Sequence, residues 1–158
     1  MKSLFNFLVL RQRLFQDGVL LFIRLLIGWQ LFLTGKGKLA HLDKITEFFA
    51  SLNIPAPGAH AVLIGCVEMF GGLALLIGLG ARGFSLLITG AMLGAYLTAH
   101  RDEAFASVGD FIEAAPFPYL VVALVVLVFG PGRASLDQLI APRLAKRIPL
   151  FHDAAEGL

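Results

Sequence analysis

The stretch Val62–Arg82, VLIGCVEMFGGLALLIGLGAR, decides the fold that the sequence predicts. It is apolar and, as a helix, long enough to cross a bilayer whose hydrocarbon core is about 30 Å thick. Near its middle it carries one carboxylate, Glu68. Because a charge at that depth costs a few kcal/mol, Glu68 needs a partner or a function.

The composition extends this interpretation to the whole chain. Of the 158 residues, 58% are hydrophobic and 15% are charged, whereas a soluble domain is roughly 45–50% apolar and about a quarter charged. The apolar residues form long blocks, as in a membrane protein with several spans. The net charge of +2 comes from scattered basic residues without interleaved aromatic side chains, which argues against a nucleic-acid partner.

The cysteine count excludes several kinds of redox and metal site. Cys66 is the single cysteine, so the chain has no internal disulfide, no CxxC pair and no four-cysteine zinc site. We interpret it as a small core residue. The first apolar run contains Arg24 and ends at Thr34-Gly35-Lys36 without a small-residue cleavage site, so we expect no cleavable signal peptide.

Hydropathy predicts an all-α integral membrane four-helix bundle that forms a single domain over residues 1–158. Short interfacial amphipathic helices are expected beside the spans: a lead-in over 1–17, a helix over 42–52, and a segment that opens the C-terminal tail, 135–158. Residues 104–115 are expected to form a loop. The four spans are expected at 18–35, 59–79, 83–99 and 116–129.

Small residues suggest how these spans pack. Gly90-Ala-Met-Leu-Gly94 is a small-xxx-small pattern, which lets helix backbones approach closely. Gly65 and Gly72 share a helical face with Glu68 and should direct this carboxylate into the bundle. The span over 116–129 has no internal polar group and is interpreted as a lipid-facing structural helix.

Basic residues near the spans predict the orientation in the membrane. With four spans, the two termini and the turn at Arg82 share one side. That side carries most of the basic residues: Lys2, Arg11, Arg13, Arg82, Arg133, Arg143, Lys146 and Arg147. The other side carries Lys36, Lys38, Lys44 and Arg101 among the acids Asp43, Glu47, Asp102, Glu103, Asp110 and Glu113. Both termini are therefore expected to be cytoplasmic.

The polar residues inside the spans lie at comparable depths. By helical rise Glu68 lies about 12 Å below the outer end of its span, and Gln30 lies about 9 Å below Lys36. His100 closes the third span at the same surface, and Lys38 closes the first. We therefore expect these side chains to converge on a cavity that opens outward.

The same residues also have structural interpretations, which the sequence leaves open. Glu68 can be a neutral, hydrogen-bonded acid that holds two helices together, because burial favours the uncharged form of a carboxylic acid. Arg24 lies too deep to reach Glu68 and can extend to the near interface or pair with Asp17. His100 can be a solvated interfacial histidine. A metal site made of Glu68 and His100 has too few ligands, so we predict none.

Several short motifs occur in a fixed order along the chain. They are Gly35-x-x-Lys38-Leu39, Phe48-Phe49 through Ile54-Pro55, Glu68-x-x-Gly71-Gly72, and Gly130-Pro-Gly-Arg133-x-Ser135-Leu-Asp137. Together they resemble the DoxX family over about residues 24–139. The resemblance implies a four-helix protein of the bacterial inner membrane.

The resemblance also implies a link to redox chemistry. Members of that family are associated with quinone-linked respiratory oxidoreduction, including a small subunit of thiosulfate:quinone oxidoreductase, and others with thiol and oxidative-stress homeostasis through soluble partners. The single Cys66 argues against a self-contained thiol redox role. The chain is then at most an oxidoreductase subunit without a redox cofactor of its own.

The leading hypothesis is a quinone-interacting membrane subunit of a redox complex. A quinone site needs an apolar slot, a donor for a carbonyl, and a carboxylate or imidazole that moves protons. Glu68 and His100 are the candidate catalytic residues. The candidate quinone-binding residues are Arg24, Trp29, Gln30, Lys38 and Phe70. Quinone would be a substrate, no cofactor would be covalently bound, and electrons would come from a partner.

Two further hypotheses remain open. One is a non-catalytic membrane anchor or assembly subunit, in which the acidic outer loops or the basic tail bind a soluble oxidoreductase or another subunit. The other is a small-solute permease, for which two copies of the chain would have to enclose the pathway. In every case the lipid bilayer is the first partner.

Overall fold

The structure is a computed structural model that describes the backbone of residues 2–145. Within that range all regular structure is helical. The predicted all-α class is therefore confirmed, and the end of the basic tail lies outside the described residues. The helices are α1 (Lys2–Ala40), α2 (Leu42–Ser51), α3 (Pro57–Ile77), α4 (Ala81–Leu97), α5 (Arg101–Ala106), α6 (Val108–Glu113), α7 (Phe117–Phe129) and α8 (Leu136–Ala145).

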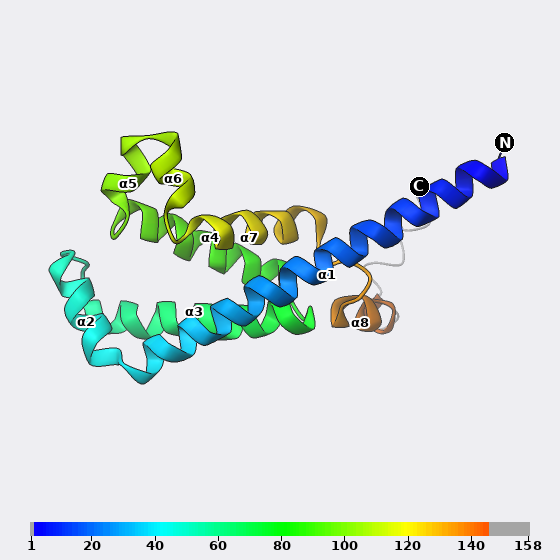
Figure 1. Cartoon of the computed structure of the whole chain (residues 1–158). Helices are drawn as coiled ribbons and strands as arrows, with labels where there is room; N and C mark the ends of the chain where they lie inside the picture. The colour runs from blue at the N-terminus through cyan, green and yellow to red at the C-terminus, as the bar shows by residue number, and fades with distance from the viewer. Residues whose placement is uncertain (1, 146–158) are drawn as a thin grey trace.

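The four longer apolar helices contact one another in a ring. α1 packs along α3, α3 on α4, α4 on α7, and α7 on α1. Figure 1 shows α2, α5 and α6 at one end of this arrangement, whereas α8 and the N-terminal half of α1 lie at the other end. The short helices α2, α5 and α6 and the helix α8 therefore lie at opposite ends of the four longer helices.

α1 is one continuous helix, so the expected break between a lead-in and a first span is wrong. The lead-in was predicted to stop at Asp17, before Gly18. A single helical glycine costs only about 1 kcal/mol relative to alanine, and a methyl group at Gly18 would meet nothing within 4 Å. No proline interrupts the run, and the helix ends only at the turn formed by His41.

Glycines set the close approach of α1 to α3. A methyl group on Gly72 would lie 2.6 Å from the Gly28 carbonyl oxygen, and one on Gly35 would lie 2.7 Å from that of Gly65. Both distances are too short for a carbon–oxygen contact, so the two backbones can pack this closely only without side chains at these positions. The small-residue face around Glu68 therefore lies against α1, which agrees with the expectation that this face is turned toward another helix.

The expected close approach at Gly90 and Gly94 is not found. A methyl group at either glycine would meet nothing within 4 Å, so no neighbouring helix lies against this part of α4. The pattern small-xxx-small permits a close contact but does not identify the partner helix. In this structure the two glycines face open space instead.

A charged cap closes the turn between α3 and α4. Gly78 adopts a positive φ of 70° at the end of α3, a conformation that favours glycine. The Asp137 carboxylate, from the start of α8, accepts hydrogen bonds from the backbone N–H groups of Gly80 (2.7 Å) and Ala81 (3.1 Å). It thereby satisfies free N–H groups at the N-terminus of α4 and ties α8 to this turn.

Two expectations for the second half of the chain are wrong. Residues 104–115 are not a loop but contain the second half of α5 and all of α6. The Ser107 hydroxyl caps α6 by accepting a hydrogen bond from the Asp110 N–H (3.1 Å). α7 does not simply face lipid, because Ala123 and Val126 are fully buried against its neighbours. An all-apolar helix gives no sequence signal that distinguishes its packed face from its outer face.

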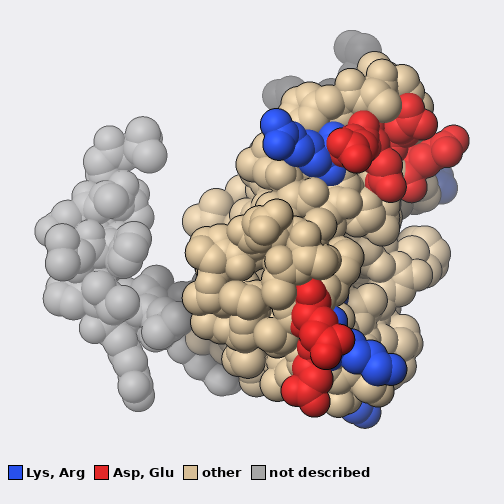
Figure 2. Space-filling model, turned by 90° about the vertical axis from the view of Figure 1, so that its left-hand side faces the viewer, with Lys and Arg blue, Asp and Glu red and all other residues tan. Residues whose placement is uncertain are grey.

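Within residues 2–145, two helices are long and apolar enough to cross a membrane. They are the part of α1 over Leu14–Ala40 and the whole of α3. α4 and α7 are apolar but shorter, with 17 and 13 residues. Figure 2 views the end of the molecule that carries α2, α5 and α6, and shows two groups of acidic side chains separated by an uncharged area.

Candidate functional site

An ion pair joins the end of α1 to the middle of α3. The Lys38 ammonium lies 2.5 Å from Oε1 of Glu68. The glycine contact between Gly35 and Gly65 lies one turn away on each helix, and it brings the two backbones close enough for this pairing. The Glu68 side chain is 5% exposed and that of Lys38 is 30% exposed, so the carboxylate is the deeper partner.

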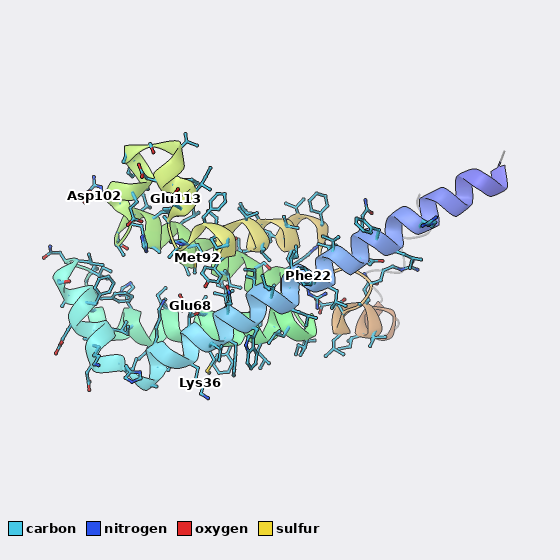
Figure 3. The ribbon with its side chains drawn as sticks, viewed as in Figure 1. Phe22, Lys36, Glu68, Met92, Asp102 and Glu113 are labelled. Carbon is cyan, nitrogen blue, oxygen red and sulfur yellow. The ribbon has the colours of Figure 1, made fainter. Side chains whose placement is uncertain are left out.

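The second carboxylate oxygen of Glu68 has no partner. Among the described residues, Oε2 of Glu68 is one of two buried side-chain oxygens without a hydrogen bond, the other being the Ser85 hydroxyl. A buried acceptor left in this state costs about 1–3 kcal/mol, and more when it is charged. Figure 3 shows Glu68 on the side of α3 that faces α4, where Met92 is labelled. A hydrogen-bond donor is therefore needed in this space.

Glu68 and Lys38 line a pocket of about 720 Å³ between α2, α3 and α4. A volume of that size is typical of small-molecule sites. Apart from the ion pair, its walls are mainly apolar or small side chains, with histidines near the outer end. The walls include Phe48 and Phe49 on α2, Leu63 and Val67 on α3, and Leu87, Gly90, Ala91 and Gly94 on α4.

His100 also lines this pocket, at the outer end of α4. Its Nδ1 lies 2.7 Å from Oε2 of Glu103, so its ring is oriented by α5. Together with Glu68 and Lys38, His100 completes the set of three predicted site residues that the structure brings to one pocket. Within the described residues, no three metal-ligating side chains lie together.

Four other residues expected near this site lie elsewhere. Trp29, Gln30 and Phe70 are exposed on the outside of α1 and α3, and Phe70 borders a separate apolar groove. Figure 3 shows Lys36 pointing away from the other helices. Gln30 and Lys36 were placed by depth, and Trp29 and Phe70 as aromatic residues of the spans, without regard to rotation about the helix axis. Trp29 and Lys36 are about 180–200° around α1 from Lys38, and Phe70 is about 200° around α3 from Glu68.

Arg24 belongs to a different, structural site. It is fully buried, and its guanidinium donates to the carbonyl oxygens of Leu75 (2.9 Å), Pro131 and Ala134 (3.3 Å). It thus ties the C-terminal end of α3 to the segment before α8. Arg24 was expected to extend to the near membrane interface or to pair with Asp17, and neither arrangement is found. The Arg24 side chain is fully buried, and Asp17 Oδ1 accepts the Arg133 N–H (3.0 Å) instead.

The sequence interpretation missed the α2 and α4 walls of the pocket. Phe48 and Phe49 were identified only as part of an amphipathic helix, although the apolar face of such a helix must cover something. Gly90 and Gly94 were assigned to helix packing. Their shared face was recognised, but spacing within α4 alone does not show that this face borders a pocket.

Comparisons with known proteins agree with this architecture. The sequence profile of the DoxX family matches residues 19–101, which is more than half of the chain and includes the Lys38–Glu68 pair and His100. DoxX proteins are membrane proteins, and two helices of this chain are long and apolar enough to span a bilayer.

One curated relative supports the same assignment. The chain is 28% identical over 97 residues to a protein of Bacillus subtilis (strain 168) named "Putative oxidoreductase CatD", a match that covers 61% of this chain and 70% of that protein. No solved structure matches the chain. From the profile match and this relative we conclude that the chain belongs to the DoxX family.

Proposed function

We propose that the chain is a redox-linked protein of the bacterial inner membrane that binds a quinol in the Glu68 pocket. In this proposal α1, α3, α4 and α7 form a membrane-spanning four-helix bundle with both termini in the cytoplasm. α4 and α7 cover only about 26 Å and about 20 Å by helical rise, so their flanking turns complete the crossing. The excess of basic residues at the α8 end supports this orientation.

The unpartnered Oε2 of Glu68 is the observation that supports the quinol most strongly. Oε1 already accepts a hydrogen bond from Lys38, so the pocket lacks a donor rather than an acceptor. A quinol carries two hydroxyl donors on an apolar ring, and the walls of the pocket are mainly apolar. The reduced form therefore satisfies Oε2, whereas a quinone offers only acceptors.

The ion pair also suits proton transfer. Oxidation of a quinol to a quinone releases two electrons and two protons. A carboxylate within hydrogen-bond distance of a hydroxyl can accept one of those protons, and the other leaves to water at the outer end of the pocket, beside His100. The electrons then pass to a redox group on a partner protein. The relative named as an oxidoreductase supports a redox setting for this chain.

A non-catalytic anchoring role is the second candidate. The acidic side chains on α2, α5 and α6 gather at one end of the molecule (Figure 2), and they would suit a partner with a basic surface. In that case the Lys38–Glu68 pair only holds α1 against α3, and Oε2 has no ligand.

Quinol titration separates these two candidates. The protein is reconstituted in lipid nanodiscs, and the Kd of a quinol is measured for the wild type and for Glu68→Gln. Loss of the charged acceptor should raise the Kd about tenfold, because hydrogen bonds to charged groups are roughly twice as strong as neutral ones. Glu113→Gln, which removes an exposed acid from α6, is the matched control and should leave the Kd unchanged.

The same experiment defines failure. If the wild type does not bind the quinol, or if Glu68→Gln and Glu113→Gln bind it equally well, the quinol proposal is wrong. Stable co-purification of both variants with a soluble oxidoreductase would then favour the anchoring role.

A further inference from the structure

The α4 wall of the Glu68 pocket consists of bare backbone at two positions. Gly90 and Gly94 are exposed, both line the pocket, and a methyl group at either would meet nothing within 4 Å. They are one helical turn apart on the same face of α4. The small side chains of Ala91 and Ala95 continue this wall. It is therefore flat and unoccupied over at least one turn.

The pocket is open along its flank as well as at its outer end. Leu63 on α3 is 56% exposed and Leu87 on α4 is 52% exposed, yet both line the pocket. α3 and α4 join at the turn near Gly80, and Figure 1 shows the two helices diverging from there toward α2 and α5. The opening between Leu63 and Leu87 thus lies on the side of the molecule.

In the membrane arrangement proposed above, this flank faces the hydrocarbon of the bilayer. A ligand that enters there must be dissolved in the membrane. Glu68 supplies the polar end of the path, because it lines the same pocket and its buried Oε2 has no partner. The path therefore has a polar inner end and an apolar lateral opening.

We propose that the Gly90–Gly94 face is the docking surface for a tailed aromatic ring that enters laterally from the bilayer. The ring lies flat on the α4 backbone, its hydroxyl donates to Glu68 Oε2, and its apolar tail leaves between Leu63 and Leu87 into lipid. This inference rests on the proposed quinol site and adds the entrance, the ring-binding face and the requirement for a tail.

A second copy of the chain is the alternative occupant, since small-xxx-small faces often join membrane helices. A two-fold contact through this face would bring together the same small residues from both copies. None of Gly90, Ala91, Gly94 and Ala95 has a side-chain donor for Glu68 Oε2. The unpartnered carboxylate oxygen therefore favours a ligand over a second copy.

Glycine variants of α4 test the docking face. Gly94→Leu should raise the Kd of a decyl-tailed benzoquinol about tenfold or more, because the side chain fills the space that the ring needs. Gly94→Ala fits the open space without a clash and should give a smaller rise, which covers the case in which Gly94→Leu does not fold. Gly83→Leu is the matched control, since Gly83 is an equally open glycine of α4 outside the pocket, and its Kd should stay within about twofold of the wild type.

Tail length tests the lateral entrance. In nanodiscs the wild type should bind the decyl-tailed quinol more tightly than the tail-less benzoquinol, with membrane concentrations used for both ligands. Equal affinities would overturn the lateral entrance, and equal affinities of the Gly94 and Gly83 variants would overturn the docking face. Both results would leave the quinol site itself standing, provided that Glu68→Gln still weakens binding.

The oligomeric state is measured on the same samples by native mass spectrometry. If Gly94→Leu converts a dimer into a monomer while quinol affinity is unchanged, a second copy covers this face and the proposal is wrong. If the wild type binds neither quinol, the docking proposal fails together with the proposed function.

Discussion

Arg24 gives the most quantitative expectation for stability. Replacement by Met keeps the length of the side chain and removes every hydrogen bond that the guanidinium donates. The bonds to Ala134 (3.3 Å) and Leu76 (3.5 Å) are long, which leaves those to Leu75 (2.9 Å) and Pro131 as the main ones. A hydrogen bond to a charged group contributes about 1.5–3 kcal/mol, so two of them amount to roughly 3–6 kcal/mol.

This loss also leaves carbonyl oxygens unpaired at the C-terminal end of α3. Because Arg24 is fully buried, water cannot readily reach these carbonyl oxygens and replace the lost hydrogen bonds. We therefore expect Arg24→Met to lower the free energy of unfolding by about 3–5 kcal/mol, because the hydrogen bonds to the charged guanidinium are lost and the carbonyl oxygens stay unpaired. Arg24→Lys should lose about half as much, because a single ammonium cannot reach both α3 and the segment before α8.

Reversible unfolding by dodecyl sulfate in mixed micelles measures these changes. Arg82→Met is the matched control, because Arg82 is exposed and donates one long hydrogen bond, to Val128 (3.3 Å). It should cost less than about 1 kcal/mol. A cost for Arg24→Met that does not exceed the cost for Arg82→Met would refute the structural role assigned to Arg24.

Two further substitutions test how the helices are joined. Gly35→Ala should cost about 1–3 kcal/mol and weaken the Lys38–Glu68 pair, because its methyl group would lie 2.7 Å from the Gly65 carbonyl oxygen; Gly37→Ala has open space and should be neutral or slightly stabilising in the same unfolding assay. Asp137→Ala removes the cap of α4 and should cost about 0.5–2 kcal/mol. Hydrogen exchange at the Gly80 and Ala81 amides should rise in that variant, and unchanged protection would contradict the capping role.

The sequence predicts the local elements of this protein well. The amphipathic period over 42–52 identifies α2, and the apolar run around Glu68 identifies α3. Depth along the helices also predicts that Lys38 and His100 lie near Glu68, since both close their spans at the surface about 12 Å above it. Each of these inferences depends on spacing within one helix, which the sequence states directly.

Contacts between helices were harder to predict, because they depend on rotation about each helix axis. Trp29 and Phe70 were assigned to the site as aromatic residues of the spans, whereas their helical phase places them on the outside. The glycines of α4 and those of α1 look equivalent in sequence, yet Gly35 lies against α3 and Gly94 faces open space. A small residue permits a close contact, but the partner is determined by the tertiary fold.

The carboxylate of Glu68 tests the central claim most directly. Infrared difference spectroscopy compares the reconstituted protein with and without quinol, and Glu68→Gln identifies which carboxylate band belongs to this residue. If a quinol hydroxyl donates to Oε2, the Glu68 carboxylate band shifts on addition of the quinol and no such shift occurs in Glu68→Gln. An unchanged Glu68 band at saturating quinol, or the same difference spectrum in wild type and variant, would contradict the account.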